Sequence, residues 1–76
     1  MKELVEVMAK ALVDHPGEVS VTETEEDGIV KVVLKVAPAD MGKVIGRQGR
    51  IAKAIRAVVK AASTKTGQKV DVEISQ

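Results

Sequence analysis

The sequence predicts an α+β fold whose elements follow the order α-β-β-α-α-β. Two observations predict the elements: apolar residues recur at helical spacing near the N-terminus and after residue 50, and they alternate with polar residues in three short segments. Turn signals separate these segments, namely Pro16-Gly17, Asp27-Gly28 and Thr66-Gly67. With 76 residues the chain has room for one small domain, which we expect to span residues 1–76.

The first half of the chain predicts a helix followed by a β-hairpin. An apolar stripe predicts a helix over roughly residues 2–14, and its members are Leu4, Val5, Met8, Ala11 and Leu12. Residues 18–22 alternate as a strand that continues, more polar, toward residue 26. Asp27-Gly28 predicts a tight turn because both residues can adopt positive φ at low cost. The alternation of residues 30–36 predicts the second strand.

The second half predicts two helices and a final strand. Asp40 is the predicted N-cap of a short helix that runs to about Ile45. A longer helix begins after residues 46–49 and ends at Thr66-Gly67. Its apolar residues fall on one side, with basic residues on the opposite side; the apolar set is Ile51, Ile55, Val58, Val59 and Ala62. Residues 70–74 alternate as the last strand.

Composition argues against several classes of function. Hydrophobic residues make up 45% of the chain, which suits a folded domain, and Cys is lacking, which excludes disulfides and thiolate metal sites. With one His and no pair of carboxylates expected to be buried together, the sequence offers no catalytic site. We therefore expect that the protein is not an enzyme and that it uses neither a cofactor nor a small-molecule substrate. The acidic run of residues 23–27 lacks fixed ligand geometry, so no metal site is expected. No apolar run is long enough for a membrane span and the N-terminus lacks a signal, which predicts a cytoplasmic protein.

Charge is divided unevenly along the chain. Residues 1–28 carry eight acidic and two basic side chains, whereas residues 40–65 carry seven basic side chains and one acidic. This asymmetry indicates an anionic partner for the basic segment. The alternative is a solvated helix face, which composition alone favours.

The segment Gly46-Arg47-Gln48-Gly49 is the one motif that could carry chemistry. Glycine allows another backbone to approach closely, and the segment leads into the positive end of the long helix, where phosphate binds well. Lys43 and Arg50 add charge there. The spacing fits neither a P-loop nor a dinucleotide-binding loop, and a plain corner between two helices is the alternative.

The run Val44–Ile51 resembles the signature loop of KH domains, and the element order is similar to the type II, prokaryotic topology. The similarity is greatest to the KhpA family of small bacterial single-KH proteins, on three segments: residues 12–16, 37–46 and 50–56. This resemblance implies a mixed three-stranded sheet covered by helices on one face. One departure is that Ile51 comes two positions after Gly49, whereas many KH domains have three.

The resemblance also implies a nucleic-acid site, in which the loop clamps the backbone of about four unpaired nucleotides. The implied RNA-binding residues are Lys43, Val44, Ile45, Gly46, Arg47, Gln48, Gly49, Arg50, Ile51 and Lys53. Aliphatic side chains, with Val33 or Leu34 added, would form the platform for bases, so the 0% aromatic content excludes only proteins that stack bases on rings. Helical spacing favours Ile45, Ile51 and Ile55 as core residues over base contacts, and Arg56 and Lys60, which lie further from the loop, are interpreted as solvated.

The function that follows is binding of single-stranded RNA, or of single-stranded DNA, as a post-transcriptional regulator or RNA chaperone. The resemblance further implies a homodimer, or a heterodimer with a larger KH protein of the KhpB (Jag) type. The alternative function is a protein-interaction subunit of a KhpA/KhpB complex that controls cell elongation, division and shape, with RNA binding secondary.

Overall fold

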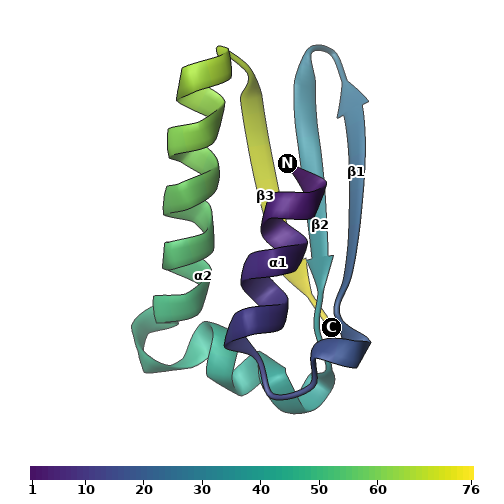
Figure 1. Ribbon diagram of the computed structural model, residues 1–76, viewed down its shortest axis with the longest axis vertical. Helices are drawn as coiled ribbons and strands as arrows, with labels where there is room; N and C mark the ends of the chain where they lie inside the picture. The colour runs from purple at the N-terminus through teal and green to yellow at the C-terminus, as the bar shows by residue number, and fades with distance from the viewer.

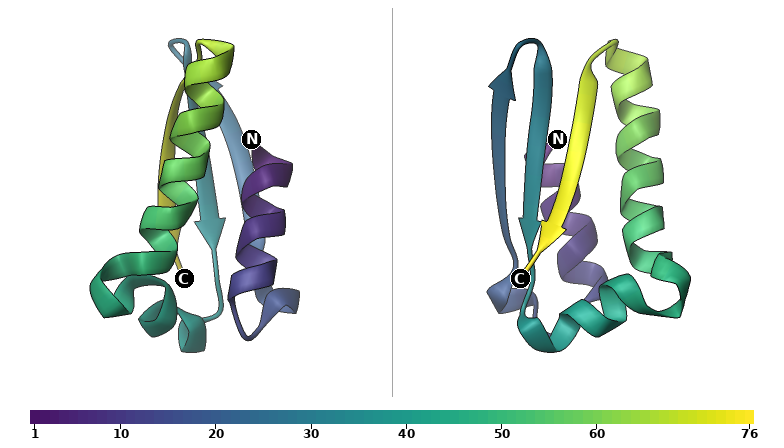
Figure 2. Two further views of the ribbon diagram at one scale, coloured as in Figure 1. Left: turned by 60° about the vertical axis from the view of Figure 1, so that its left-hand side comes forward. Right: turned by 180° about the vertical axis from the view of Figure 1, so that it is seen from behind.

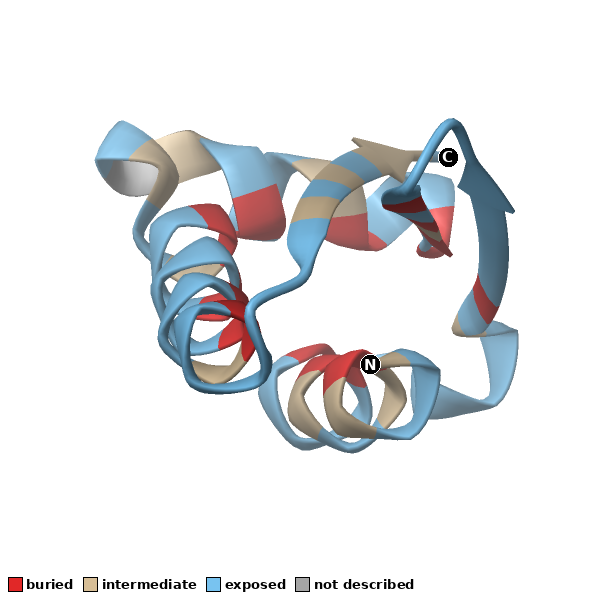
Figure 3. Cartoon of the chain, turned by 90° about the horizontal axis from the view of Figure 1, so that it is seen from above, coloured by how far each residue is buried: buried red, intermediate tan, exposed pale blue. Residues whose placement is uncertain are grey.

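Two helical elements cover one face of a three-stranded sheet in the computed structural model, which describes residues 1–76 apart from the side chain of Arg47 (Figure 1). The elements in chain order are α1 (Lys2–Leu12), the short 3-10 helix η1 (Pro16–Glu18), β1 (Ser20–Glu26), β2 (Ile29–Lys35), α2 (Pro38–Thr66) and β3 (Lys69–Ser75). Seen from above, α1 and α2 lie on the same side of the strands (Figure 3). The predicted α+β class and one-sided sheet are confirmed.

The sheet is mixed and has the strand order β1-β2-β3. β1 pairs with β2 antiparallel, and the turn between them has φ 53° at Asp27 and 78° at Gly28, as the Asp-Gly signal predicted. β3 pairs with β2 in parallel, with Val72 opposite Val32. A parallel neighbour requires a long crossover, and α2 supplies it.

The core is entirely aliphatic and lies between the sheet and the helices. β2 directs Val30, Val32 and Leu34 inward, and α1 packs Val5 and Ala9 against them. α2 contributes four buried aliphatic residues to this core, Val44, Ala52, Ile55 and Val59. Alternation along β2 and helical spacing along α2 therefore act together to bury one continuous cluster.

The other face of the sheet is exposed and carries charged side chains. The alternating exposed residues of β3 are Lys69, Asp71 and Glu73, and Lys31 on β2 lies 3.9 Å from Glu73 between Nζ and Oε2. β1 and β3 are both edge strands. Among the described helices, none is long and apolar enough to cross a membrane.

Several predicted boundaries are wrong. β2 begins and ends one residue earlier than the predicted 30–36, and β3 extends one residue beyond each end of the predicted 70–74. α1 ends at Leu12 instead of residue 14, and Glu18 belongs to η1 instead of β1, because Pro16 starts a helical turn there. Asp40 is not an N-cap: Ala37 occupies that position, and α2 begins at Pro38, whose fixed φ suits the first turn of a helix.

Candidate nucleic-acid interface

The G-x-x-G segment forms an elbow in the middle of α2. Gln48 has φ 65° and Gly49 has φ 67°, and two left-handed residues in succession cannot continue a right-handed helix. The short arm (residues 38–47) therefore runs across one end of the sheet, and the long arm (residues 50–66) runs beside β3 (Figure 2). The predicted short helix, glycine segment and long helix correspond to these three parts of α2.

The elbow leaves room on its outer side. Among the described residues, a Cβ built on Gly46 or on Gly49 would meet no heavy atom within 4 Å apart from the adjoining residues and the nearby helix backbone. Neither glycine is therefore required for packing inside the protein, although Gly49 is favoured by its positive φ. The space is available to an external backbone, and the positive end of the long arm's dipole lies at the same place.

The implied site residues divide into exposed, half-buried and core positions. Val44 has no exposed surface and packs in the core, so it supports the elbow from beneath. Ile45 is 48% exposed, which overturns its interpretation as a core residue, because the short arm packs through Val44 instead. Ile55 is a core residue, as helical spacing indicated.

The other site residues lie around the elbow. Ile51, Gly46 and Gly49 are half-buried there; the exposed positions are Lys43, Gln48, Arg50 and Lys53, and the side chain of Arg47 lies outside the described part of the chain. Of the two strand residues suggested for the base platform, Leu34 is fully buried and Val33 is half-buried on the outer sheet face.

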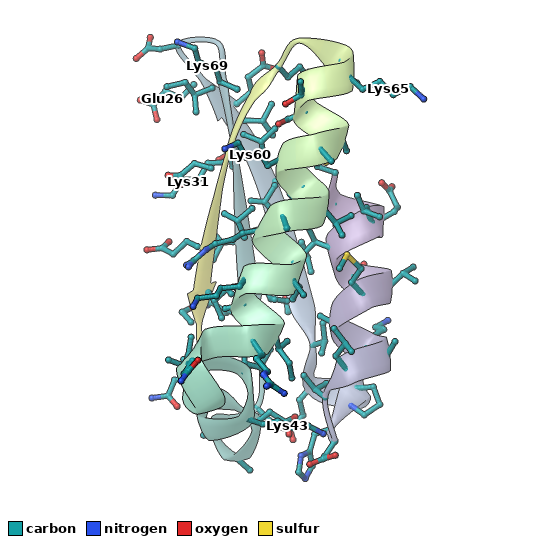
Figure 4. The ribbon with its side chains drawn as sticks, turned by 90° about the vertical axis from the view of Figure 1, so that its left-hand side faces the viewer. Glu26, Lys31, Lys43, Lys60, Lys65 and Lys69 are labelled. Carbon is teal, nitrogen blue, oxygen red and sulfur yellow. The ribbon has the colours of Figure 1, made fainter. Side chains whose placement is uncertain are left out.

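A groove of about 450 Å³ lies between the long arm and β3, further along the long arm than the elbow. Its lining includes the cationic side chains of Arg56 and Lys60 from α2 and of Lys69 from β3, the carboxylate of Asp71, and the apolar side chains of Val70 and Val72. Figure 4 shows Lys60 and Lys69 beside β3, whereas Lys65 points away from it.

Sequence reasoning treated Arg56 and Lys60 as merely solvated. Both are exposed, and they also line the groove. The helical spacing of Lys53, Arg56 and Lys60 places all three on one stripe of the helix, and this pattern could have identified them from the sequence. Recognising a groove also requires knowing that β3 lies next to that stripe.

Asp40 anchors the short arm to the segment that follows α1. Its side chain is 1% exposed and accepts hydrogen bonds from the backbone N–H groups of Asp14, at 3.2 Å to Oδ1, and His15, at 3.0 Å to Oδ2. His15 Nδ1 lies 3.3 Å from Oδ1. Burial acts to raise the pKa of Asp40, but the hydrogen bonds with the His15 ring and the two amides outweigh it, so the pKa is lowered.

Comparison with known proteins agrees with this geometry. The sequence model of the family "KhpA/KhpB, KH domain" matches residues 2–74. The chain is similar to the RNA-binding protein KhpA of Clostridium perfringens, with 62% identity over 74 residues that cover 97% of this chain and 99% of the relative. The KhpA proteins of Clostridium acetobutylicum and Caldanaerobacter subterraneus are 60% and 58% identical over the same 97% of this chain and 99% of each relative. The chain belongs to the KhpA/KhpB KH-domain family.

Proposed function

We propose that this protein binds single-stranded RNA, with the elbow of α2 against the sugar–phosphate backbone. The observation that carries the proposal is the left-handed turn at Gln48 and Gly49, which leaves open space outside the glycines and directs a basic helix stripe along a groove. The name of these relatives, RNA-binding protein KhpA, supports RNA as the ligand. In this proposal residues 1–76 act as one KH unit, with residues 46–49 as its loop.

The proposed binding mode separates backbone contacts from base contacts. Gly46 and Gly49 allow the strand to approach, and Arg50 and Lys53 neutralise phosphates along the start of the long arm. Ile45 and Ile51 provide aliphatic surface for bases beside the loop. Contacts to the 2′-hydroxyl would favour RNA over single-stranded DNA of the same sequence. The protein would thus act by binding, without catalysis, as a regulator or chaperone of transcripts in the cytoplasm.

The salt dependence of binding tests this mode. We expect the affinity for a fluorescent oligouridine to fall with salt, with a log–log slope near −3, because four contacted phosphates on a single strand each contribute about −0.7. Fluorescence anisotropy across a salt series measures the slope. Replacing Arg50 with Gln should reduce its magnitude by about 0.7, whereas Lys65→Gln, on the far side of the helix, should leave it unchanged. If Arg50→Gln and Lys65→Gln gave the same log–log slope, the proposed path of the RNA along the start of the long arm would be contradicted.

A second proposal concerns association through the outer side of the long arm. Val58 is 39% exposed, and its exposed neighbours Ala54 and Ala61 extend the apolar stripe along the helix. One small unit contacts few nucleotides, so a second copy, or a larger KhpB-type KH protein, would increase affinity by linking two sites. We propose this stripe as the surface for such pairing, which is also the surface that a role in cell elongation and division would use.

Introducing a charge on the stripe tests the pairing. Val58→Lys should convert a dimer to a monomer, because a buried, unpaired ammonium is costly at an apolar interface. Sedimentation at micromolar concentrations measures the change. Ile29→Lys, at a 43% exposed position on the outer face of the sheet, is the matched control and should leave the dimer intact. A wild-type protein that sediments as a strict monomer would exclude self-association.

A further inference from the structure

A hollow of about 490 Å³ opens between the end of α1 and the elbow of α2. Its lining includes two cationic side chains, Lys43 and Arg50, together with Ile51 and the carboxylate of Asp14. Lys43 lies on the α1 side of α2, across the long arm from β3 (Figure 4). Phosphate would be attracted to both cations here, so the presence of an acidic residue on the same hollow calls for an explanation.

Asp14 holds the ammonium group of Lys43. The distance from Lys43 Nζ to Asp14 Oδ1 is 3.0 Å, and the two side chains are 46% and 69% exposed. An ion pair this exposed contributes little to the stability of a fold. A contribution to stability therefore does not explain why the Asp14 carboxylate lies here. Its direct effect is on Lys43, whose ammonium group already has an anionic partner within the protein.

The position of Asp14 is fixed by a buried contact and not by the ion pair alone. The backbone N–H groups of Asp14 and His15 donate to the carboxylate of Asp40, which is 1% exposed. Lys43 follows Asp40 by three residues, so both side chains lie on the same side of the short arm. The segment after α1 and the short arm are thus joined as one unit, and Asp14 is held next to Lys43 before any ligand arrives.

We propose that Asp14 is a negative determinant of RNA binding, which occupies Lys43 and keeps phosphate away from that cation. This inference rests on the proposed function. With Lys43 occupied, the strand is directed toward the β3 side, where Arg56 and Lys60 line the groove. Asp14 thereby lowers the affinity of a path that would use Lys43.

Neutralising Asp14 without changing its shape tests the inference. Asp14→Asn should bind oligouridine about 3- to 10-fold more tightly at low salt, and its log–log slope should become steeper by about 0.7, because Lys43 then neutralises one more phosphate. Glu25→Gln, an exposed position on β1, makes the same change in net charge and should leave the slope unchanged. Adding Lys43→Gln to Asp14→Asn should reverse the gain.

The outcomes separate this inference from the proposed function. A wild-type protein without salt-dependent RNA binding overturns the proposed function, and the inference with it. Binding by the wild-type protein, combined with an Asp14→Asn variant that behaves like Glu25→Gln, overturns the inference alone. Weaker binding by Asp14→Asn overturns it as well, because Asp14 would then contact the RNA as an acceptor. Thermal melting of each variant verifies that the fold is retained.

Discussion

Replacing both Gly46 and Gly49 with Asp is expected to weaken RNA binding by about 100-fold or more, because placing like charges together costs several kcal/mol at an interface. Each new carboxylate would occupy the open space outside the elbow, where no described heavy atom beyond the adjoining residues and the nearby helix backbone lies within 4 Å of the added Cβ. The fold should survive, because Gly46 has no positive φ and Asp is among the residues that tolerate the left-handed conformation of Gly49. Anisotropy titrations measure the loss, and circular dichroism checks the fold.

Two control proteins make this result specific to the elbow. The pair Gly17→Asp and Gln76→Asp adds the same two charges at exposed positions away from the elbow, and it should bind with nearly wild-type affinity. The pair Gly46→Ala and Gly49→Ala adds Cβ atoms without charge, and its smaller loss of affinity isolates the contribution of close approach. If the double Asp protein binds as well as its charge control, the elbow is not the site.

Asp40→Ala is expected to lower the midpoint of thermal unfolding by about 10 °C, because two backbone N–H groups lose their acceptor in one substitution. Asp40→Asn keeps one carbonyl acceptor and should fall between Ala and wild type. Asp71→Ala removes an exposed carboxylate from β3 and is the matched control, with little expected change. Equal melting of Asp40→Ala and Asp71→Ala would contradict the anchoring role of this buried carboxylate.

The substitution Asp40→Asn should also change how the stability of the fold depends on pH. Because folding lowers the pKa of Asp40, its stabilising contribution is present above the unfolded value of about 3.9 and is lost as the pH falls through the lower folded-state pKa. Wild-type stability should therefore decline at acid pH more steeply than that of Asp40→Asn. Urea denaturation at a series of pH values between 3 and 7 measures both curves, and parallel curves would contradict this source of the acid sensitivity.

Local sequence patterns were sufficient to predict most of the fold. Alternation in β2 and the Asp27-Gly28 turn depend on neighbouring residues only, and both are as expected. The glycine segment could likewise be singled out from its own spacing. Local patterns could not predict contacts between distant segments. The carboxylate of Asp40 accepts hydrogen bonds from backbone amides 25 and 26 residues away, whereas its neighbours in the sequence suggested that it caps its own helix.

Helical spacing could not predict the groove or the exposure of Ile45, for a related reason. Helical spacing identifies which residues share a stripe, but not which neighbour that stripe faces. Arg56 and Lys60 gain their position from the parallel pairing of β3 with β2, and Ile45 is exposed because the short arm crosses only the end of the sheet. Both depend on the arrangement of elements in space.

The bare outer face of the sheet has a consequence for behaviour in concentrated solution. An uncovered sheet with two open edges could stack or extend into fibres, as flat apolar strands do. Here Lys69, Asp71 and Glu73 alternate along one edge strand, and Lys31 pairs with Glu73 across to the next. Any neighbouring sheet would have to dehydrate these charges. The charged outer face therefore opposes aggregation through the sheet, and the helical side remains available for specific contacts.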